Sequence, residues 1–210
     1  MKKILIGITL ATVMMLSVGF AAAGEQEYQT GDIIFQTTRG SLATVVATAT
    51  QSKLTHVGMI IMKKNKPYVI ESRNRGVKIR PLNKFTQAGF GKNFSVLRLK
   101  QGLSREQKLK LAKEARRHLG KKYDSKFRWD DKRLYCSELV YKAYLNALGI
   151  ELNTTEKLGD FYSSWNPIVN AFVKRKYGNA KKLPLEEKAI TPVRLYESNM
   201  LSLVYDNYPL

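Results

Sequence analysis

The chain has 210 residues, with 36 lysines and arginines against 17 acidic residues, which gives a formal net charge of +19. Hydrophobic residues make up 44% of it and charged residues 25%, a balance that excludes wholesale disorder and fibrous structure. One cysteine and two histidines exclude an internal disulfide, a multi-cysteine metal site and a histidine-rich metal centre, so we expect one globular domain without a metal or other cofactor.

The first 23 residues have the pattern of a secretory signal peptide. Lys2 and Lys3 precede an uncharged, mostly apolar run at 4–20, and the run Ala21–Ala23 fits a small-residue cleavage site. A single membrane span is the alternative, because 17 residues are at the short limit for crossing a bilayer. We expect cleavage before Gly24, which leaves a periplasmic protein with a net charge of +17 and no membrane span.

Strands are expected first in the mature chain, because short apolar or alternating runs are separated by turn residues. The expected strands are residues 31–35, 57–62, 68–71, 77–80 and 94–99, with a turn at 63–67 that makes a hairpin and an Ala/Thr/Val-rich helix at 41–52.

Helices are expected later in the chain. Ser104 and Gln107 match a capping box that begins a helix at 104–119, which Gly120 ends. A second helix is expected at 136–148, an irregular segment at 151–187 and a last strand at 201–205. Strands followed by helices, without regular alternation, predict an α+β fold with a mostly antiparallel sheet.

The positive charge gathers in segments 63–66, 108–122 and 174–182, expected to be a turn, a helix face and a loop. A solvated surface and attraction to a partner are alternative explanations. No nucleic-acid-binding motif occurs, so we expect no nucleic-acid partner. Anionic envelope material, such as phospholipid head groups, lipopolysaccharide or peptidoglycan carboxylates, is the partner that suits an exported protein.

Cys136 lies where the second predicted helix begins. The free N–H groups and the positive end of the helix dipole at that place stabilise a thiolate, and the same N–H groups can bind an oxyanion. The alternative is a buried structural cysteine. An unpaired thiol in an exported protein is an oxidation liability, which favours a functional explanation.

His56 and Glu71 lie on the two strands of the predicted hairpin, so the carboxylate could orient the imidazole beside Cys136. The alternatives are a half-exposed histidine and a surface salt bridge. His118, the other histidine, lies near the end of the first helix among Arg116, Arg117 and lysines. That cationic surrounding favours a surface role for His118.

Six stretches, in this order along the chain, resemble the YiiX-like family of circularly permuted papain-like amidases, which is related to NlpC-type cell-wall peptidases and lecithin–retinol acyltransferase. They are residues 29–36 (QTGDIIFQ), 55–59 (THVGM), 66–71 (KPYVIE), 119–124 (LGKKYD), 135–140 (YCSELV) and 184–187 (PLEE). The histidine precedes the cysteine, which is the order of the permuted branch.

The resemblance implies that residues 24–210 form a permuted papain-like amidase domain in which the helix of Cys136 packs on the sheet. It implies that Cys136 is the nucleophile, His56 the base, and Glu71 the group that orients the base. Tyr123 matches the active-site tyrosine, whose hydroxyl could bind the oxyanion or position the carbonyl. The alternative for Tyr123 is an aromatic side chain that packs on the core.

Three functions are consistent with these residues. The first is a cysteine amidase or peptidase that acts through a thioester on an envelope amide, such as a peptidoglycan stem peptide, or on a lipid-linked acyl substrate. The second is a lipid acyl hydrolase or acyltransferase, and the third a catalytically silent module that binds an acyl chain or glycan. Five aromatic residues could line an apolar pocket for an acyl chain: Phe127, Trp129, Phe161, Tyr162 and Trp165.

Overall fold

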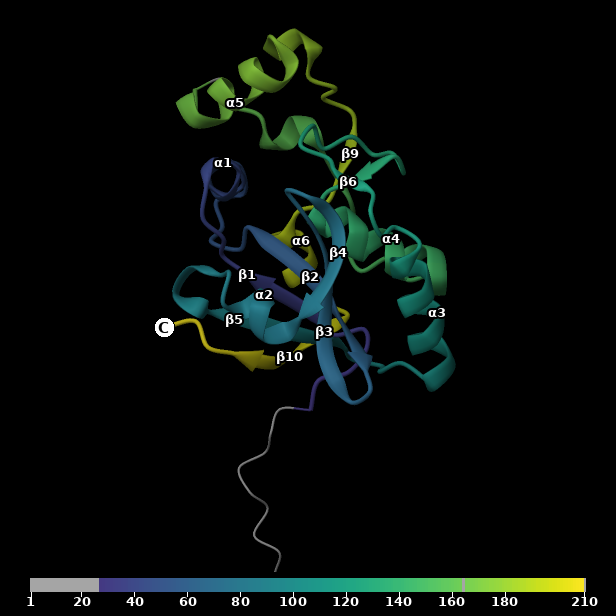
Figure 1. The fold of residues 1–210 in the computed structure, drawn as a ribbon. Helices are drawn as coiled ribbons and strands as arrows, with labels where there is room; N and C mark the ends of the chain where they lie inside the picture. Colours follow the sequence, from purple (N-terminus) through teal and green to yellow (C-terminus); the bar gives the residue numbers. More distant parts are fainter. Residues whose placement is uncertain (1–26, 164, 210) are drawn as a thin grey trace, which may run out of the picture.

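The computed structural model describes residues 27–163 and 165–209, so the predicted signal peptide lies outside the described residues. A six-stranded sheet in the order β10-β5-β1-β2-β3-β4 forms the centre of the molecule, and all its neighbouring strands are antiparallel (Figure 1). The strands are β1 (Ile33–Gln36), β2 (His56–Lys63), β3 (Lys66–Arg73), β4 (Gly76–Pro81), β5 (Phe94–Leu99) and β10 (Leu201–Asp206). Every predicted strand is present, including the hairpin of β2 and β3.

Helices and two short strand pairs surround this sheet. The helices are α1 (Ser41–Thr50), α2 (Leu82–Thr86), α3 (Arg105–Arg116), α4 (Cys136–Leu148), α5 (Pro167–Tyr177) and α6 (Pro192–Tyr196), with 3₁₀ turns at Phe90–Lys92, Leu158–Phe161 and Ala180–Lys182. Strand β6 (Lys122–Tyr123) pairs in parallel with β7 (Arg133–Leu134), and β8 (Glu156–Lys157) pairs antiparallel with β9 (Lys188–Ala189). The α+β class is therefore confirmed.

The two faces of the sheet carry separate apolar clusters, as strand alternation requires. Ile33, Phe35 and Met59 face α4 and pack with Leu139 and the other buried residues of that helix. The opposite face packs against α2 through a second set of side chains, Ile34, Ile60, Val69, Phe85 and Val96. Each fully buried aliphatic side chain of this kind stabilises the fold by about 1.5–3 kcal/mol.

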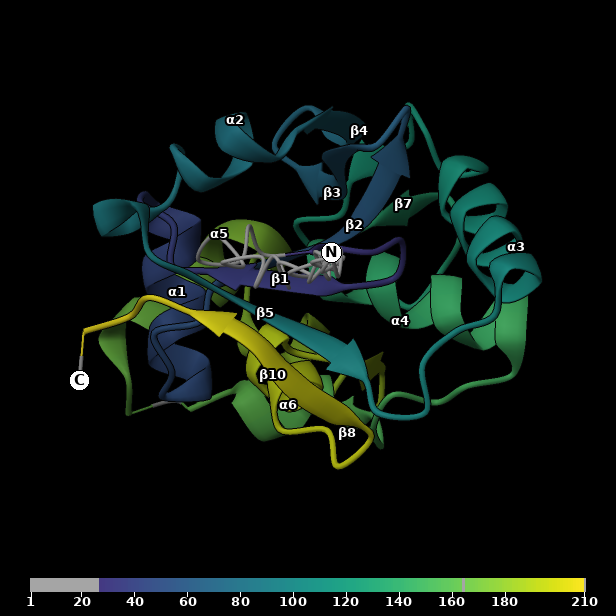
Figure 2. The ribbon, with the colours of Figure 1, turned by 90° about the horizontal axis from the view of Figure 1, so that it is seen from below.

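Helix α4 begins beside the starting end of β2, and α1 and α3 lie on opposite sides of the molecule (Figure 1, Figure 2). The predicted capping box at the start of α3 is present, because Ser104 Oγ accepts from Gln107 N at 3.2 Å and Gln107 Oε1 accepts from Ser104 N at 2.8 Å. In residues 27–163 and 165–209, no helix combines the length and the apolar character needed to cross a bilayer.

The expectation of an irregular segment at 151–187 is wrong for its middle, where α5 forms. Asn166 caps this helix by accepting from the N–H groups of Ile168 and Val169, and Pro167 occupies its first turn. Val169, Phe172 and Val173 follow the helical i, i+3, i+4 spacing and are buried with Val45 of α1. An extra layer of α1 and α5 therefore stands beside the start of β2.

Candidate active site

Cys136 is the first residue of α4 and is 5% exposed. The backbone N–H groups of Ser137 and Val57 and the imidazole of His56 lie around its sulfur, and their hydrogen-bond interactions lower the pKa of the thiol. The start of a helix and the start of a strand therefore meet at this thiol. An anionic sulfur would have three donors here.

His56 is the first residue of β2, and Glu71 lies near the end of the antiparallel β3. His56 Nε2 lies 2.5 Å from Glu71 Oε2, and both side chains are buried. Because Nε2 is occupied by the carboxylate, the other ring nitrogen, Nδ1, is the atom left for Cys136. The structure brings the three predicted residues into one chain of contacts.

Arg80 and Phe85 complete the surroundings of this chain, although the sequence analysis did not single them out. Arg80 Nε lies 2.6 Å from Glu71 Oε1, and Arg80 Nη2 donates to Glu71 Oε2 at 3.2 Å. The Phe85 ring stacks on His56 at a centroid distance of 5.6 Å, and the Arg80 guanidinium lies 5.2 Å from the same ring. Glu71 thus has two cationic partners, His56 and Arg80. The stacked Phe85 ring holds the imidazole of His56 in one plane.

These contacts set the protonation of the pair. Burial opposes the protonation of His56, but its hydrogen bonds to Cys136 and Glu71 and their charges raise its pKa to about 9. Burial alone would raise the pKa of the Cys136 thiol, yet the hydrogen bond and charge of His56 lower it below its usual value. Burial would likewise raise the pKa of Glu71, but the interactions with His56 and Arg80 outweigh it and lower the pKa. Both shifts favour the thiolate–imidazolium pair over the neutral pair.

Tyr123 reaches the site through the short parallel pairing of β6 with β7, which places Tyr123 beside Leu134, two residues before Cys136. The segment before it is bound to β4, because Lys121 O accepts from Val77 N at 2.8 Å. Gly76 permits this approach, since its φ is +93° and a Cβ there would lie 2.2 Å from Lys121 O. Burial, with the charge of Cys136, raises the pKa of Tyr123 well above 10, so its hydroxyl stays a donor.

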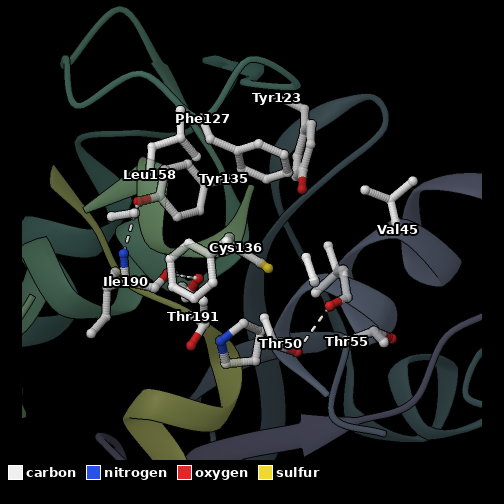
Figure 3. A pocket seen from close by; sticks show the side chains of 16 residues that line it. Val45, Thr50, Thr55, Tyr123, Phe127, Tyr135, Cys136, Leu158, Ile190 and Thr191 are labelled. Atoms are coloured by element: carbon white, nitrogen blue, oxygen red, sulfur yellow. Dashed lines mark hydrogen bonds between the residues drawn. The ribbon is translucent and has the colours of Figure 1, made fainter. Parts of the chain in front are cut away.

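An apolar pocket of about 540 Å³ opens beside the Cys136 sulfur, and the sulfur and the Tyr123 hydroxyl both point into it (Figure 3). Its walls come from α1, the residues around β7 and α4, and the segment that joins β9 to α6. The lining includes Val45, Val46, Ala49, Phe127, Leu158, Phe161 and Ile190. A second apolar cavity of about 380 Å³ shares five of these residues and continues between α1 and α5.

The aromatic residues expected at a pocket divide into two groups. Phe127 and Phe161 line both cavities, and Tyr162 lines the second. Trp129 instead packs on Tyr141, with Lys142 Nζ 4.8 Å from its ring, and Trp165 is 93% exposed. The expectation that the two tryptophans line the pocket is therefore wrong, because the 128–131 loop turns Trp129 toward α4.

His118 is 2% exposed, so the expectation of a surface role is also wrong. The chain turns directly after α3 and carries the ring inward, where His118 Nε2 lies 3.6 Å from Glu114 Oε1. Burial and the charge of Lys121 lower the pKa of His118. His56, which interacts with both Glu71 and Cys136, is therefore the histidine of the site.

Comparison with known proteins places this chain in a family. The sequence profile described as "Permuted papain-like amidase enzyme, YaeF/YiiX, C92 family" matches residues 27–205. The chain belongs to this family. The protein YiiX of Escherichia coli strain K12 is 42% identical over 182 residues, which cover 87% of this chain and 88% of that protein.

A solved structure is similar over the same extent. The crystal structure of YiiX from Escherichia coli O157:H7, which is called a metalloprotein, is 42% identical to this chain with a TM-score of 0.82. The match covers 87% of this chain and 99% of the other. Family and structure together confirm the predicted resemblance and the permuted papain-like fold.

In the part of the chain that the structure describes, the donor side chains do not fit a metal centre. Within the two described ranges, no three side chains of His, Cys, Asp or Glu are grouped so that they could hold an ion. His56 binds Glu71 and Cys136, and His118 faces Glu114 alone among carboxylates within 4.0 Å in the described residues.

Proposed function

We propose that the protein is a cysteine amidase that hydrolyses an N-acyl amide through a thioester acyl-enzyme. The observation that carries the proposal is the continuous contact from Glu71 through His56 to Cys136 at the wall of an apolar pocket. A nucleophile, a base and a group that orients the base are the parts that thiol acyl transfer requires. Membership in a family of permuted papain-like amidases supports the same class of reaction.

In the first half-reaction, the Cys136 thiolate attacks the amide carbonyl carbon and a C–S bond forms. The carbonyl electron pair moves onto the oxygen, which accepts from the Tyr123 hydroxyl and the Cys136 backbone N–H. The His56 imidazolium then donates its proton to the amide nitrogen, the C–N bond breaks, and the amine leaves. The products of this step are the free amine and a thioester on Cys136.

In the second half-reaction, neutral His56 removes a proton from a water molecule, and the oxygen of that water attacks the thioester carbonyl. The C–S bond breaks, which regenerates the Cys136 thiolate and releases the carboxylic acid. Glu71 keeps the imidazole in one orientation through both steps and offsets its charge each time it is protonated.

The pocket beside the sulfur favours an apolar acyl group, which is the lipid-linked class of substrate. A lipid chain gains about 0.8 kcal/mol for each CH₂ that it buries, whereas the polar groups of a peptidoglycan stem peptide would lose their hydrogen bonds with water there. An acyltransferase is the second candidate, because an amine or alcohol can replace water at the same thioester.

Turnover of synthetic N-acyl amides with acyl chains of increasing length tests the proposal. We expect kcat/KM to rise with chain length until the pocket is filled, and mass spectrometry of quenched protein to show an acyl adduct on Cys136. Cys136→Ser should lose the thioester and nearly all turnover while it still binds the acyl chain. Hydrolysis of muropeptides by the wild type without dependence on an acyl chain would overturn the choice of substrate.

Binding without turnover would point to the third function, a silent acyl-binding module. The decisive comparison is the reaction of Cys136 with iodoacetamide as a function of pH. An active thiol should react with a midpoint below the usual value of about 8.5. A thiol that reacts only above that value, in a protein that binds acyl chains but forms no adduct, would overturn the enzymatic function.

We also propose that the protein is exported to the periplasm after cleavage near Gly24, as the pattern of residues 1–23 indicates. The intact mass of the protein from the periplasmic fraction measures this directly. A chain that begins at Met1 and remains with the membrane fraction would contradict it.

A further inference from the structure

A second cleft borders the active site and shares Tyr123 with the apolar pocket, and we call it the polar cleft. Its first part, of about 420 Å³, is lined by Thr38, Arg39, His56, Arg73, Asn74 and Tyr123 among others. It continues into a space of about 600 Å³ beside Ser125, Arg175 and Lys176. Tyr123 lines the apolar pocket and both parts of the polar cleft.

Four cationic side chains from three parts of the fold converge on the polar cleft. Arg39 precedes α1, Arg73 ends β3, and Arg175 and Lys176 lie near the end of α5. No carboxylate lines the cleft, and in the described part of the chain none of the four forms an ion pair with one. Arg39 lies over the Phe90 ring at 4.6 Å, and Lys176 donates to Ser125 Oγ at 2.8 Å, so these contacts are with neutral groups.

Glu71 is a carboxylate that interacts electrostatically with the cleft. The charge of Arg73 helps to lower its pKa. Glu71 is already bound on one oxygen by His56 and on the other by Arg80. Its charge is therefore balanced inside the site and does not neutralise the cleft. The four cations together leave an excess of positive charge next to the imidazole.

The two cavities differ in which reacting residue they expose. Cys136 lines the apolar pocket but not the polar cleft, whereas His56 lines the polar cleft but not the apolar pocket. The group that protonates a leaving amine must lie within hydrogen-bond reach of its nitrogen. The leaving amine therefore lies on the His56 side of the sulfur, and the acyl group lies on the other side.

We propose that the polar cleft binds an anionic group, a phosphate or a carboxylate, carried by the amine that leaves from the scissile amide. The proposal rests on the proposed function for the direction of the reaction and adds the chemistry of the leaving group. Arginine is suited to this task because its planar guanidinium offers paired donors to phosphate and carboxylate oxygens. A cationic amine component would be repelled, and an apolar one would desolvate Arg73 without compensation.

Three substrates that share one acyl chain test the proposal. Their leaving amines carry a phosphate, a carboxylate or a neutral hydroxyl at the same position. We expect the wild type to prefer either anionic substrate to the neutral one in kcat/KM by about tenfold or more, mainly through KM. The Arg39→Gln/Arg73→Gln variant should reduce that ratio by about tenfold.

Lys64→Gln is the matched control, because it removes a positive charge at the exposed turn between β2 and β3. The preference for anionic leaving groups should persist in this variant. A wild type with no preference, or a ratio that the arginine changes leave intact, would overturn the proposal. Preference for phosphate alone would indicate a phospholipid-like amine component, and preference for carboxylate alone an amino-acid-like one.

A binding measurement separates this proposal from the proposed function. Cys136→Ser protein is titrated with O-phosphoethanolamine and with unmodified ethanolamine, with calorimetry as the readout. Binding of the phosphate compound that Arg73→Gln weakens would support the cleft even if no amide is hydrolysed. Turnover of acyl amides together with no phosphate or carboxylate binding would overturn the cleft and leave the proposed function intact.

Discussion

The His56 imidazole lies between a buried carboxylate and a buried thiol. Glu71 has no exposed surface, and a lone charge at such a position would cost several kcal/mol. Arg80 offsets that charge from one side and His56 from the other, at 2.6 and 2.5 Å. The imidazole therefore gains a permanent anionic partner, which favours its protonated form throughout the neutral range.

The first prediction concerns pH. The thiolate–imidazolium pair forms as pH rises through the lowered pKa of Cys136 and is lost as pH rises through about 9, the pKa of His56. We therefore expect kcat/KM to fall with a midpoint near pH 9. Glu71→Gln removes an interaction that raises the pKa of His56, so the falling limb should move to lower pH. The measurement is kcat/KM against pH for both proteins.

The control for this change is Glu106→Gln, which removes a carboxylate that is exposed on α3 and pairs only with Lys110 in the described residues. Its falling limb should coincide with that of the wild type. An unshifted limb in Glu71→Gln would mean that Glu71 acts on the fold alone and leaves the imidazole unaffected.

The predicted hairpin made a contact between His56 and Glu71 possible, and the resemblance to the permuted family implied that both lie beside Cys136. Arg80 and Phe85 could not be predicted in the same way. Arg80 occupies an alternating strand position that equally suits a solvated cation, and only the register of β3 with β4 brings it to Glu71. Contacts across strands depend on register, which a single sequence does not determine.

Helix α4 carries a buried ion pair one turn beyond the nucleophile. Lys142 Nζ lies 2.8 Å from Glu138 Oε1 and 3.0 Å from Asp131 Oδ1, while Glu138 Oε2 accepts from the Tyr135 backbone N–H. Burial raises the pKa of Glu138 to about 8 even with Lys142 present. The start of α4, and with it the position of Cys136, depends on this pair.

The second prediction is that Lys142→Met destabilises the protein by about 1–3 kcal/mol at pH 5, because it leaves the protonated Glu138 carboxyl buried without its hydrogen-bond partner. The raised pKa of Glu138 gives the sign of the pH dependence. Deprotonation of Glu138 opposes folding as pH rises. The loss of unfolding free energy caused by Lys142→Met should therefore be larger at pH 8 than at pH 5. Denaturant unfolding at both pH values measures the two free energies.

Two further variants make that measurement specific. Glu138→Gln/Lys142→Met removes both charges and should recover much of the lost stability. Lys174→Met, at an exposed position on α5, should change stability by no more than about 0.5 kcal/mol. A deficit that is the same at both pH values, or that the double variant retains in full, would contradict the role of the ion pair.

Helix α5 shows where prediction at the scale of elements failed. Its capping residues Asn166 and Pro167 and its terminal Gly178 are readable in the sequence. Its apolar stripe is short, and four of its eleven residues are lysine, arginine or asparagine. The helical spacing of the apolar residues is therefore difficult to recognise in the sequence. The helix is held by packing on α1, a contact distant in sequence that local patterns do not report.

At the scale of the whole molecule, two of the three basic segments lie at opposite ends of β2, and the third, 108–122, runs along α3 and the residues after it. The Lys63–Lys66 turn ends that strand, whereas α5 and the lysines after it lie near the end where β2 begins (Figure 1). We propose that this distribution serves weak attraction to anionic envelope surfaces, without one dedicated docking face. The charge of residues 24–210, +17, is large enough for such attraction.

The third prediction follows from that distribution. Residues 24–210 should bind vesicles that contain anionic phospholipid and bind neutral vesicles far less. Added salt should release the protein, because it shortens the screening length from about 8 Å at 0.15 M to about 3 Å at 1 M. Two matched triple variants each remove three exposed lysines, either Lys63, Lys64 and Lys66 or Lys174, Lys181 and Lys182, by changing them to Gln. Because each lysine near an anionic surface contributes up to about 1 kcal/mol, each triple should weaken binding by tenfold or more, and to a similar extent. Sedimentation with the vesicles measures the bound fraction. If one triple abolishes binding and the other has no effect, a single docking face exists; if the wild type does not bind, the charge is only a solvated surface.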